Sequence, residues 1–216
     1  MNKPLCVFGY GSLMFAPECP TALIDVRVAT LPGHRRAFNK FSTVRGCPRE
    51  HVRWPSAQPP SGFLRDGRHF SLALGTEAGD GIVGRVLVYA AEHAADALLA
   101  LDRREGFDAN SPLHFNGYDR KTVDVHTPTG SMQALAYLGN PASELYRPLS
   151  LNDQAQALLA ATPRPGTQPK EGGVEYLLET RRILAKGGIE DEHVERLMDT
   201  ILATPGPWQS WLEKQV

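Results

Sequence analysis

Two short stretches of this 216-residue chain contain residue types that could do chemistry. The first is Gly9–Leu13, read Gly-Tyr-Gly-Ser-Leu, which follows the apolar run Leu5–Phe8. Two glycines within three residues let the main chain turn sharply, and successive N–H groups in such a turn can bind a carboxylate, a phosphate or another oxygen anion. Many strands also end in a Gly-x-Gly turn that binds nothing, so this stretch alone leaves both interpretations open.

The second stretch closes an expected helix over residues 91–104, in which apolar side chains recur at helical spacing. Arg103 and Arg104 are cations that suit a helix C-terminus, and Gly106 suits the residue at which a helix stops. Glu105 therefore stands where the helix meets a loop, and a carboxylate there can reach into a cleft. The alternative is a solvated glutamate at a helix end.

Several common catalytic and metal-binding patterns do not occur in the sequence. Ser12 is not part of a G-x-S-x-G nucleophile elbow, because Met14 occupies the position of the final glycine. No Gly-Lys-Ser/Thr follows the turn, so a P-loop is not expected. The seven histidines form no HxH or HExxH pattern and the three cysteines form no CxxC pair, so neither a metal site nor a disulfide framework is expected.

The elements that must position these stretches are mostly strands in the first two thirds of the chain. Alternating apolar and polar residues predict strands over 24–30, 34–43, 69–75, 84–90, 118–126 and 132–138. The glycines and prolines predict turns at Pro32-Gly33 and at 79–81, and a hairpin turn at Pro128–Gly130. Residues 45–67, rich in proline, are expected to form a long surface loop that either frames a site or is an inert insertion.

Helices dominate the last third, with apolar residues at helical spacing over 151–161, 174–186 and 191–202. Together, the predicted strands and helices indicate an α+β protein, in which helices pack outside a curved or closed β-sheet. Residues 1–216 are expected to form one domain, of which 150–216 are a helical C-terminal extension. A net charge of −1, with acids and bases mixed along the chain, indicates no face for nucleic acid or a membrane. Because no signal peptide or membrane span is found, a cytoplasmic protein is expected.

Six short segments, in the same order along the chain, resemble motifs of the γ-glutamylcyclotransferases, and within that superfamily of its ChaC-like, glutathione-directed branch. Val7–Leu13 resembles the opening signature of the family, and Leu101–Gly106 resembles its L-D-x-R-E motif with the catalytic glutamate. Two further motifs are each matched by a pair of segments. Gly33–Phe38 and Ser42–Pro48 resemble the family segment G-x-x-R-x-F…S-T-x-x-R-G-x-P. Glu175–Leu178 and Gly188–His193 resemble its pair of C-terminal helices.

The resemblance implies a small closed β-barrel with flanking helices and a reaction that needs no cofactor. It implies a reaction in which the α-amine of a γ-glutamyl group attacks its own γ-carbonyl, forming 5-oxoproline and, from glutathione, Cys-Gly. Glu105 would be the catalytic acid and base, a role that suits a carboxylate facing an ammonium nucleophile. The substrate-binding residues would be Tyr10, Gly11, Ser12 and Leu13 of the turn, together with Arg45 and Tyr146.

Two positions, Val44 and Cys47, depart from the family pattern and leave the identity of the γ-glutamyl substrate open. The alternatives are the same reaction on another γ-glutamyl amino acid or amine, and a binding protein that keeps the fold without catalysis. A hydrolase using Ser12 as its nucleophile ranks behind both. The expected partner is a small-molecule substrate, with no nucleic acid and no membrane, and the sequence does not indicate an oligomeric state.

Overall fold

The computed structural model describes residues 3–167 and 172–215. In these ranges the strands are β1 (Leu5–Gly9), β2 (Leu23–Pro48), β3 (Leu64–Arg65), β4 (Arg68–Tyr89), β5 (Tyr118–Thr127) and β6 (Gly130–Gly139). The α-helices are α1 (Ala94–Glu105), α2 (Leu151–Ala160), α3 (Val174–Lys186), α4 (Glu192–Ala203) and α5 (Gln209–Leu212). No helix within these ranges is long and apolar enough to cross a membrane.

Five strands close into a barrel in the order β1-β6-β5-β2-β4, because β1 pairs with both β6 and β4. β1 runs parallel to β6, with Val7 opposite Leu135, and antiparallel to β4, with Leu5 opposite Tyr89. β5 and β6 form the expected hairpin, and the short β3 pairs with β4 beyond the closed ring. The predicted α+β fold, a closed β-barrel with flanking helices, is confirmed.

Two of the predicted turns are wrong, because the chain continues as strand through both of them. β2 passes through Pro32-Gly33, where Gly33 has φ +73°, a left-handed conformation that suits a local bend in a strand. β4 likewise passes through the glycine-rich residues 79–81. A Cβ atom on Gly79 would lie 2.6 Å from the Cβ atom of Arg35, so this glycine lets the strand pass close to the Arg35 side chain. Both glycines mark irregularities inside long strands.

The chain divides into two compact units, the first made of Met1–Arg36 and Gly75–Tyr146, the second of Ala37–Leu74 and Arg147–Val216. β2 and β4 each contribute residues to both units. The prediction of a single domain over 1–216 stays a prediction.

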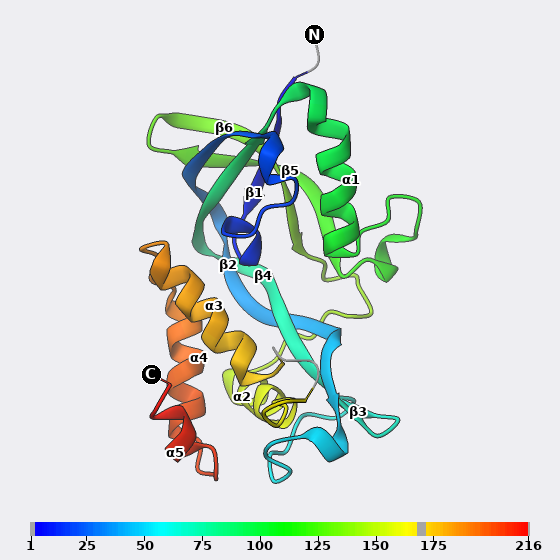
Figure 1. Ribbon diagram of the computed structural model, residues 1–216, viewed down its shortest axis with the longest axis vertical. Helices are drawn as coiled ribbons and strands as arrows, with labels where there is room; N and C mark the ends of the chain where they lie inside the picture. The colour runs from blue at the N-terminus through cyan, green and yellow to red at the C-terminus, as the bar shows by residue number, and fades with distance from the viewer. Residues whose placement is uncertain (1–2, 168–171, 216) are drawn as a thin grey trace. The chain divides into compact units, whose positions relative to one another are not determined.

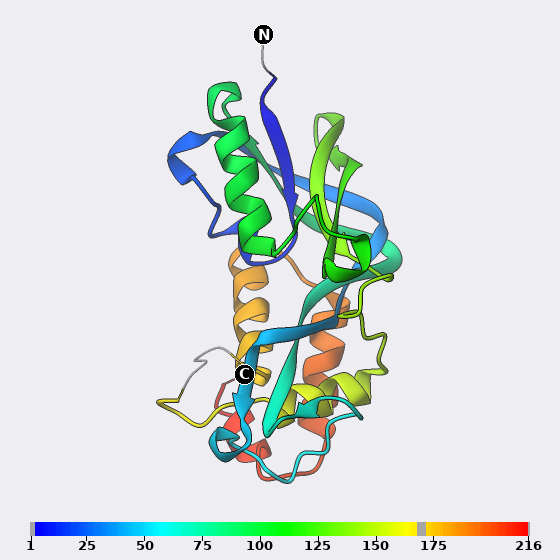
Figure 2. The same ribbon diagram turned by 90° about the vertical axis from the view of Figure 1, so that its right-hand side faces the viewer.

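In the first unit, α1 packs on the barrel through one apolar face. Its buried residues Ala97 and Leu101 belong to a cluster with Val7 of β1 and Tyr137 of β6. Figures 1 and 2 show α1, in green, running alongside β1, in dark blue. This packing fixes the helix whose last residue is Glu105, the expected catalytic residue.

In the second unit, helices form in the places that the sequence predicts. The buried side chains of α4 lie at helical spacing, and α4 packs against both α2 and α3. These residues are Val194, Leu197, Met198 and Ile201. Ser150 and Asp191 accept hydrogen bonds from backbone N–H groups in the first turns of α2 and α4, as N-cap residues do. The helical character of the C-terminal third is thereby confirmed.

The expected surface loop over 45–67 is shorter and more buried than the sequence indicates. β2 continues to Pro48, and in the segment that follows, buried side chains such as Val52, Trp54 and Phe63 are interspersed with exposed ones. Trp54 is buried, with its ring centroid 6.1 Å from that of Trp208 and 5.3 Å from that of Trp211. The backbone N–H of Arg53 donates to a carbonyl just after α2, at 2.8 Å. Aromatic packing therefore anchors this segment in its own unit.

Candidate active site

The glycine turn leaves the barrel where β1 ends. Gly84 of β4 makes room for it, because a Cβ atom at that position would lie 2.4 Å from the carbonyl oxygen of Gly9. The chain then forms one turn of 3-10 helix, Ser12–Met14, in which the N–H of Met14 donates to the carbonyl of Gly11 at 3.0 Å.

Three N–H groups of this turn have no acceptor elsewhere in the chain as described. They belong to Gly11, Ser12 and Leu13, and the first residues of any helix lack internal partners for their N–H groups. Leu13 points its side chain into the core, whereas Ser12 is exposed. Consecutive unpaired donors of this kind suit a carboxylate or another oxygen anion.

Glu105 is the last residue of α1, and the helix stops immediately after it. Gly106 adopts the left-handed conformation, with φ +64°. The N–H of Gly106 donates to the carbonyl of Arg103, and the N–H of Phe107 donates to the carbonyl of Asp102. This pair of hydrogen bonds is the Schellman motif of a helix C-terminus. The helix end expected from the sequence is therefore confirmed, and the Glu105 side chain is 19% exposed.

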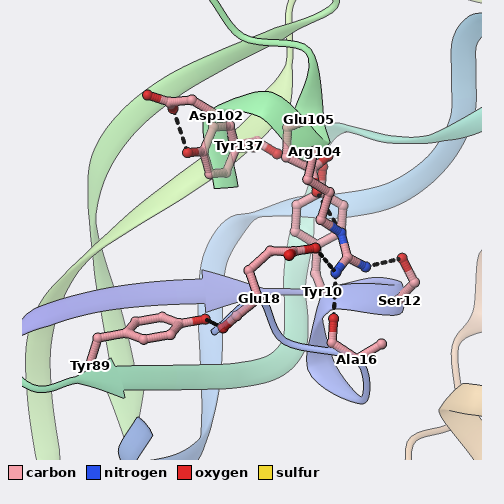
Figure 3. A network of polar contacts seen from close by, with 9 residues as sticks. All are labelled: Tyr10, Ser12, Ala16, Glu18, Tyr89, Asp102, Arg104, Glu105 and Tyr137. Carbon is pink, nitrogen blue, oxygen red and sulfur yellow. Dashed lines mark hydrogen bonds and ion pairs between the residues drawn. The ribbon is translucent and has the colours of Figure 1, made fainter. Parts of the chain in front are cut away.

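The guanidinium of Arg104 connects Glu105 to the glycine turn (Figure 3). Its Nη2 donates to Ser12 Oγ at 3.0 Å, and its Nη1 donates to the carbonyl of Ala16 and to Glu18 Oε1, the latter at 3.0 Å. Its Nε lies 3.5 Å from Glu105 Oε1. One side chain thus holds the expected base and the expected substrate-binding turn together.

A second set of polar contacts fixes the same end of α1 to the barrel. The hydroxyl of Tyr137 on β6 donates to Asp102 Oδ1 at 2.6 Å, and Arg120 on β5 pairs with the other carboxylate oxygen. Tyr10 is buried, and its hydroxyl donates to the carbonyl of Tyr137 at 2.7 Å. The Tyr10 phenol is thereby tied to β6, inside the same network (Figure 3).

Arg36 occupies a position that the sequence does not suggest. The sequence allows two interpretations of Arg35, Arg36 and Arg45, recognition of a carboxylate or a solvated strand face, and favours the second. Arg36, however, is only 1% exposed. Its Nε donates to the carbonyl of Tyr10 at 2.7 Å and its Nη2 donates to the carbonyl of Val83. The solvated interpretation is therefore wrong for Arg36, which supports the start of the glycine turn from inside the first unit.

Of the seven predicted site residues, Tyr10 to Leu13, Glu105 and Tyr146 belong to the first unit and Arg45 belongs to the second. Tyr146 follows β6, on a segment that begins at the buried Asn140, whose amide nitrogen donates to two carbonyls of residues 113–116. The guanidinium carbon of Arg45 lies 3.9 Å from the centroid of the Tyr176 ring. The roles expected for Tyr146 and Arg45 stay predictions.

An open groove of about 1050 Å³ in the second unit contains none of the predicted site residues. It runs along α3 and the start of α4, and two ion pairs line it, Arg181 with Glu195 and Arg182 with Glu179. Nowhere in residues 3–167 and 172–215 do three His, Cys, Asp or Glu side chains gather as they would around a metal ion. The expectations of no metal and no cofactor stay predictions.

Sequence reasoning missed Arg104, Glu18 and Arg36 as parts of this site. Composition alone treats Arg103 and Arg104 alike, as two adjacent cations at a helix end. The L-D-x-R-E pattern contains the signal that separates them, because it specifies an arginine at position 104 and leaves position 103 open.

Comparison with known proteins agrees with the resemblance noted in the sequence. The chain matches the family model described as ChaC-like protein over residues 5–204. It is similar to the selenomethionine-labelled crystal structure of a γ-glutamyl cyclotransferase specific to glutathione from yeast, with a TM-score of 0.66 and 19% identity, covering 93% of this chain and 96% of that chain. A second yeast structure of that description has a TM-score of 0.61 and 18% identity, with 92% and 98% covered. No curated protein matches the chain. At these identities the structural likeness shows the fold alone.

Proposed function

Because this chain belongs to the ChaC-like family, we propose that it is a γ-glutamylcyclotransferase that converts glutathione to 5-oxoproline and Cys-Gly. The two yeast proteins of similar fold are described as specific to glutathione, which supports this choice of substrate.

In the proposed reaction the α-amine of the γ-glutamyl group attacks its own γ-carbonyl carbon. A C–N bond closes the five-membered ring, and the amide bond to the cysteine residue breaks. Two protons leave the attacking nitrogen, which begins as an ammonium, and two reach the leaving nitrogen, so no water or other reactant is consumed. Glu105 carries these protons one at a time, as a base toward the substrate amine and as an acid toward the leaving amine.

The observation that carries the proposal is the contact of one guanidinium, that of Arg104, with both Glu105 and Ser12. Ring closure requires the substrate to be held by one group while a second group moves its protons, and proximity of the two is the main requirement. The N–H groups of Gly11, Ser12 and Leu13 suit the substrate carboxylate or the oxyanion that develops at the γ-carbonyl. In this proposal Tyr10 and Tyr146 complete the part of the substrate site that lies in the first unit, and Arg45 of the second unit stays a predicted substrate contact.

The test is to incubate the purified protein with glutathione and to follow 5-oxoproline and Cys-Gly by mass spectrometry. Glu105→Gln keeps the size of the side chain and removes the base, so it is expected to lower kcat by at least about 100-fold. Asp96→Asn is the matched control, because it exchanges an exposed carboxylate for an amide on the same helix.

The outcomes of this test distinguish the reaction, the substrate and the catalytic base. Both products from the wild type and the control, but not from Glu105→Gln, support the proposal. Full turnover by folded Glu105→Gln would overturn the assignment of the base. 5-Oxoproline from another γ-glutamyl compound, with none from glutathione, would keep the reaction and change the substrate. A folded protein that is inactive on glutathione and on every other γ-glutamyl compound tested would favour a binding protein without catalytic activity.

A further inference from the structure

Arg104 and Arg103 are neighbours of identical type on the last turn of α1, yet their surroundings differ. Arg103 is exposed. The side chain of Arg104 is 22% exposed and contacts Ser12, Ala16, Glu18 and Glu105. Charge-assisted hydrogen bonds are shorter and stronger than those between neutral groups, so these contacts distinguish Arg104 from its neighbour.

These contacts join two parts of the chain that are far apart in sequence. Ser12, Ala16 and Glu18 belong to the loop after β1, 86 to 92 residues before Arg104. Glu18 supplies a carboxylate that balances the guanidinium charge, and its own backbone carbonyl accepts a hydrogen bond from Tyr89 at 2.9 Å. Figure 3 shows the guanidinium between Glu18, Ser12 and the carbonyl of Ala16. The loop is thereby fastened to the helix end at several points.

The contact with Ser12 also fixes the direction of a proton. A guanidinium has five donors and no acceptor, so Ser12 Oγ must offer a lone pair to Arg104. The hydroxyl hydrogen of Ser12 therefore points away from Arg104. A charged donor on the oxygen polarises the O–H bond and makes that hydrogen a better donor to a third group.

We propose that Arg104 is a positioning residue: it fixes the Ser12–Glu18 loop to the helix end that bears Glu105, and it directs the Ser12 hydroxyl as a donor to an oxygen of the substrate. This inference rests on the proposed function for the identity of the substrate. Its structural part, the fixing of the loop, does not depend on any activity.

The structural part is tested by hydrogen exchange of the backbone amides in the Ser12–Glu18 loop. Arg104→Gln removes the guanidinium group and is expected to speed the exchange of backbone amide hydrogens in this loop by about tenfold or more. Arg103→Gln makes the same chemical change one residue away and is expected to leave exchange in the loop unchanged. Equal exchange in the two variants would overturn the inference.

The catalytic part is tested with kinetics on glutathione. Arg104→Gln is expected to lower kcat/KM by about 100-fold, since small displacements of reacting groups have effects of that size. Arg104→Lys restores the charge without the planar fork and is expected to recover part of the loss. Arg103→Gln is expected to match the wild type.

A double-mutant cycle with Ser12→Ala separates positioning from a general loss of structure. If Arg104 acts through Ser12, the Arg104→Gln change costs about tenfold less in the Ser12→Ala background, equivalent to a coupling of about 1.4 kcal/mol. Additive effects would overturn the role of the Ser12 hydroxyl. A wild type inactive on every γ-glutamyl compound would refute the proposed function and with it the catalytic part, while the exchange comparison would still decide whether Arg104 fixes the loop.

Discussion

The phenol of Tyr137 and the carboxylate of Asp102 are joined by a 2.6 Å hydrogen bond, three residues before Glu105 on α1. Burial of the phenol is the main cause that raises the pKa of Tyr137 well above its usual value, and the hydrogen bond to the Asp102 carboxylate raises it further. The contact ties the last turn of the helix to β6, so it controls where Glu105 stands. It therefore provides a way to disturb the position of Glu105 without changing Arg104, its ion-pair partner.

Tyr137→Phe removes only the hydroxyl of this pair. Asp102 keeps its partner Arg120 but loses one hydrogen bond, so the free energy of unfolding is expected to fall by about 1–2 kcal/mol. Because the helix end is less firmly held, kcat is expected to fall more than KM changes. Urea unfolding and steady-state kinetics measure the two effects. Unchanged values for both would show that the bond does not position the helix.

Gly106 provides a second test of the helix end. At φ +64°, a Cβ atom at this position meets nothing within 4 Å, so Gly106→Ala is a test of backbone strain alone. It is expected to destabilise the protein by about 1–2 kcal/mol, the cost of a left-handed conformation for a residue with a Cβ atom. Gly106→Asn is the matched control and is expected to cost less, because asparagine tolerates this conformation. Thermal unfolding that ranks Asn no better than Ala would contradict this account.

The buried Tyr89 predicts how stability depends on alkaline pH. Burial raises its pKa from 10.0 to about 12, so the folded protein keeps the phenol neutral at pH values where the unfolded chain ionises. The unfolded state then binds fewer protons, and the stability from this residue, fully present below pH 10, is lost as pH rises toward 12. Urea unfolding at a series of pH values should show a shallower decline for Tyr89→Phe. Parallel declines in the two proteins would exclude this contribution.

Cys47 is expected to be unreactive in the folded protein. It is fully buried, its Sγ lies 3.6 Å from the carbonyl oxygen of Ala161, and burial raises its pKa to about 11. Because the thiolate is the reactive form, alkylation with iodoacetamide at neutral pH should not label Cys47 until the protein is unfolded. Peptide mapping of native and denatured samples measures this. Rapid labelling of native Cys47 would contradict the packing around it.

The sequence predicts best those elements whose signal is local. The β5–β6 hairpin follows from alternation on both sides of Pro128–Gly130, and the end of α1 follows from Gly106. The turns expected at Pro32-Gly33 and at 79–81 are wrong, because a glycine that bends a strand and a glycine that ends one leave the same local pattern. Only pairing with neighbouring strands distinguishes the two cases.

In the candidate site, too, features with a local sequence signal are predictable and contacts between distant residues are not. Glu105 and the glycine turn are recognisable from short motifs, whereas the contacts of Arg104 join residues 86 to 92 positions apart, and one of its acceptors is a backbone carbonyl. A backbone acceptor leaves no mark in the residue types, so the carbonyl of Ala16 could not be inferred from them. Burial of Arg36 is equally invisible, because its acceptors are the carbonyls of Tyr10 and Val83.

The path of the chain limits how this protein can change over evolution. The backbone passes between the two units at 36–37, 74–75 and 146–147, and two of these crossings lie inside β2 and β4. Neither unit therefore corresponds to one continuous stretch of gene. Recombination at a single breakpoint therefore cannot exchange one unit and leave the other intact, and an exchange of the second unit needs breakpoints at all three crossings.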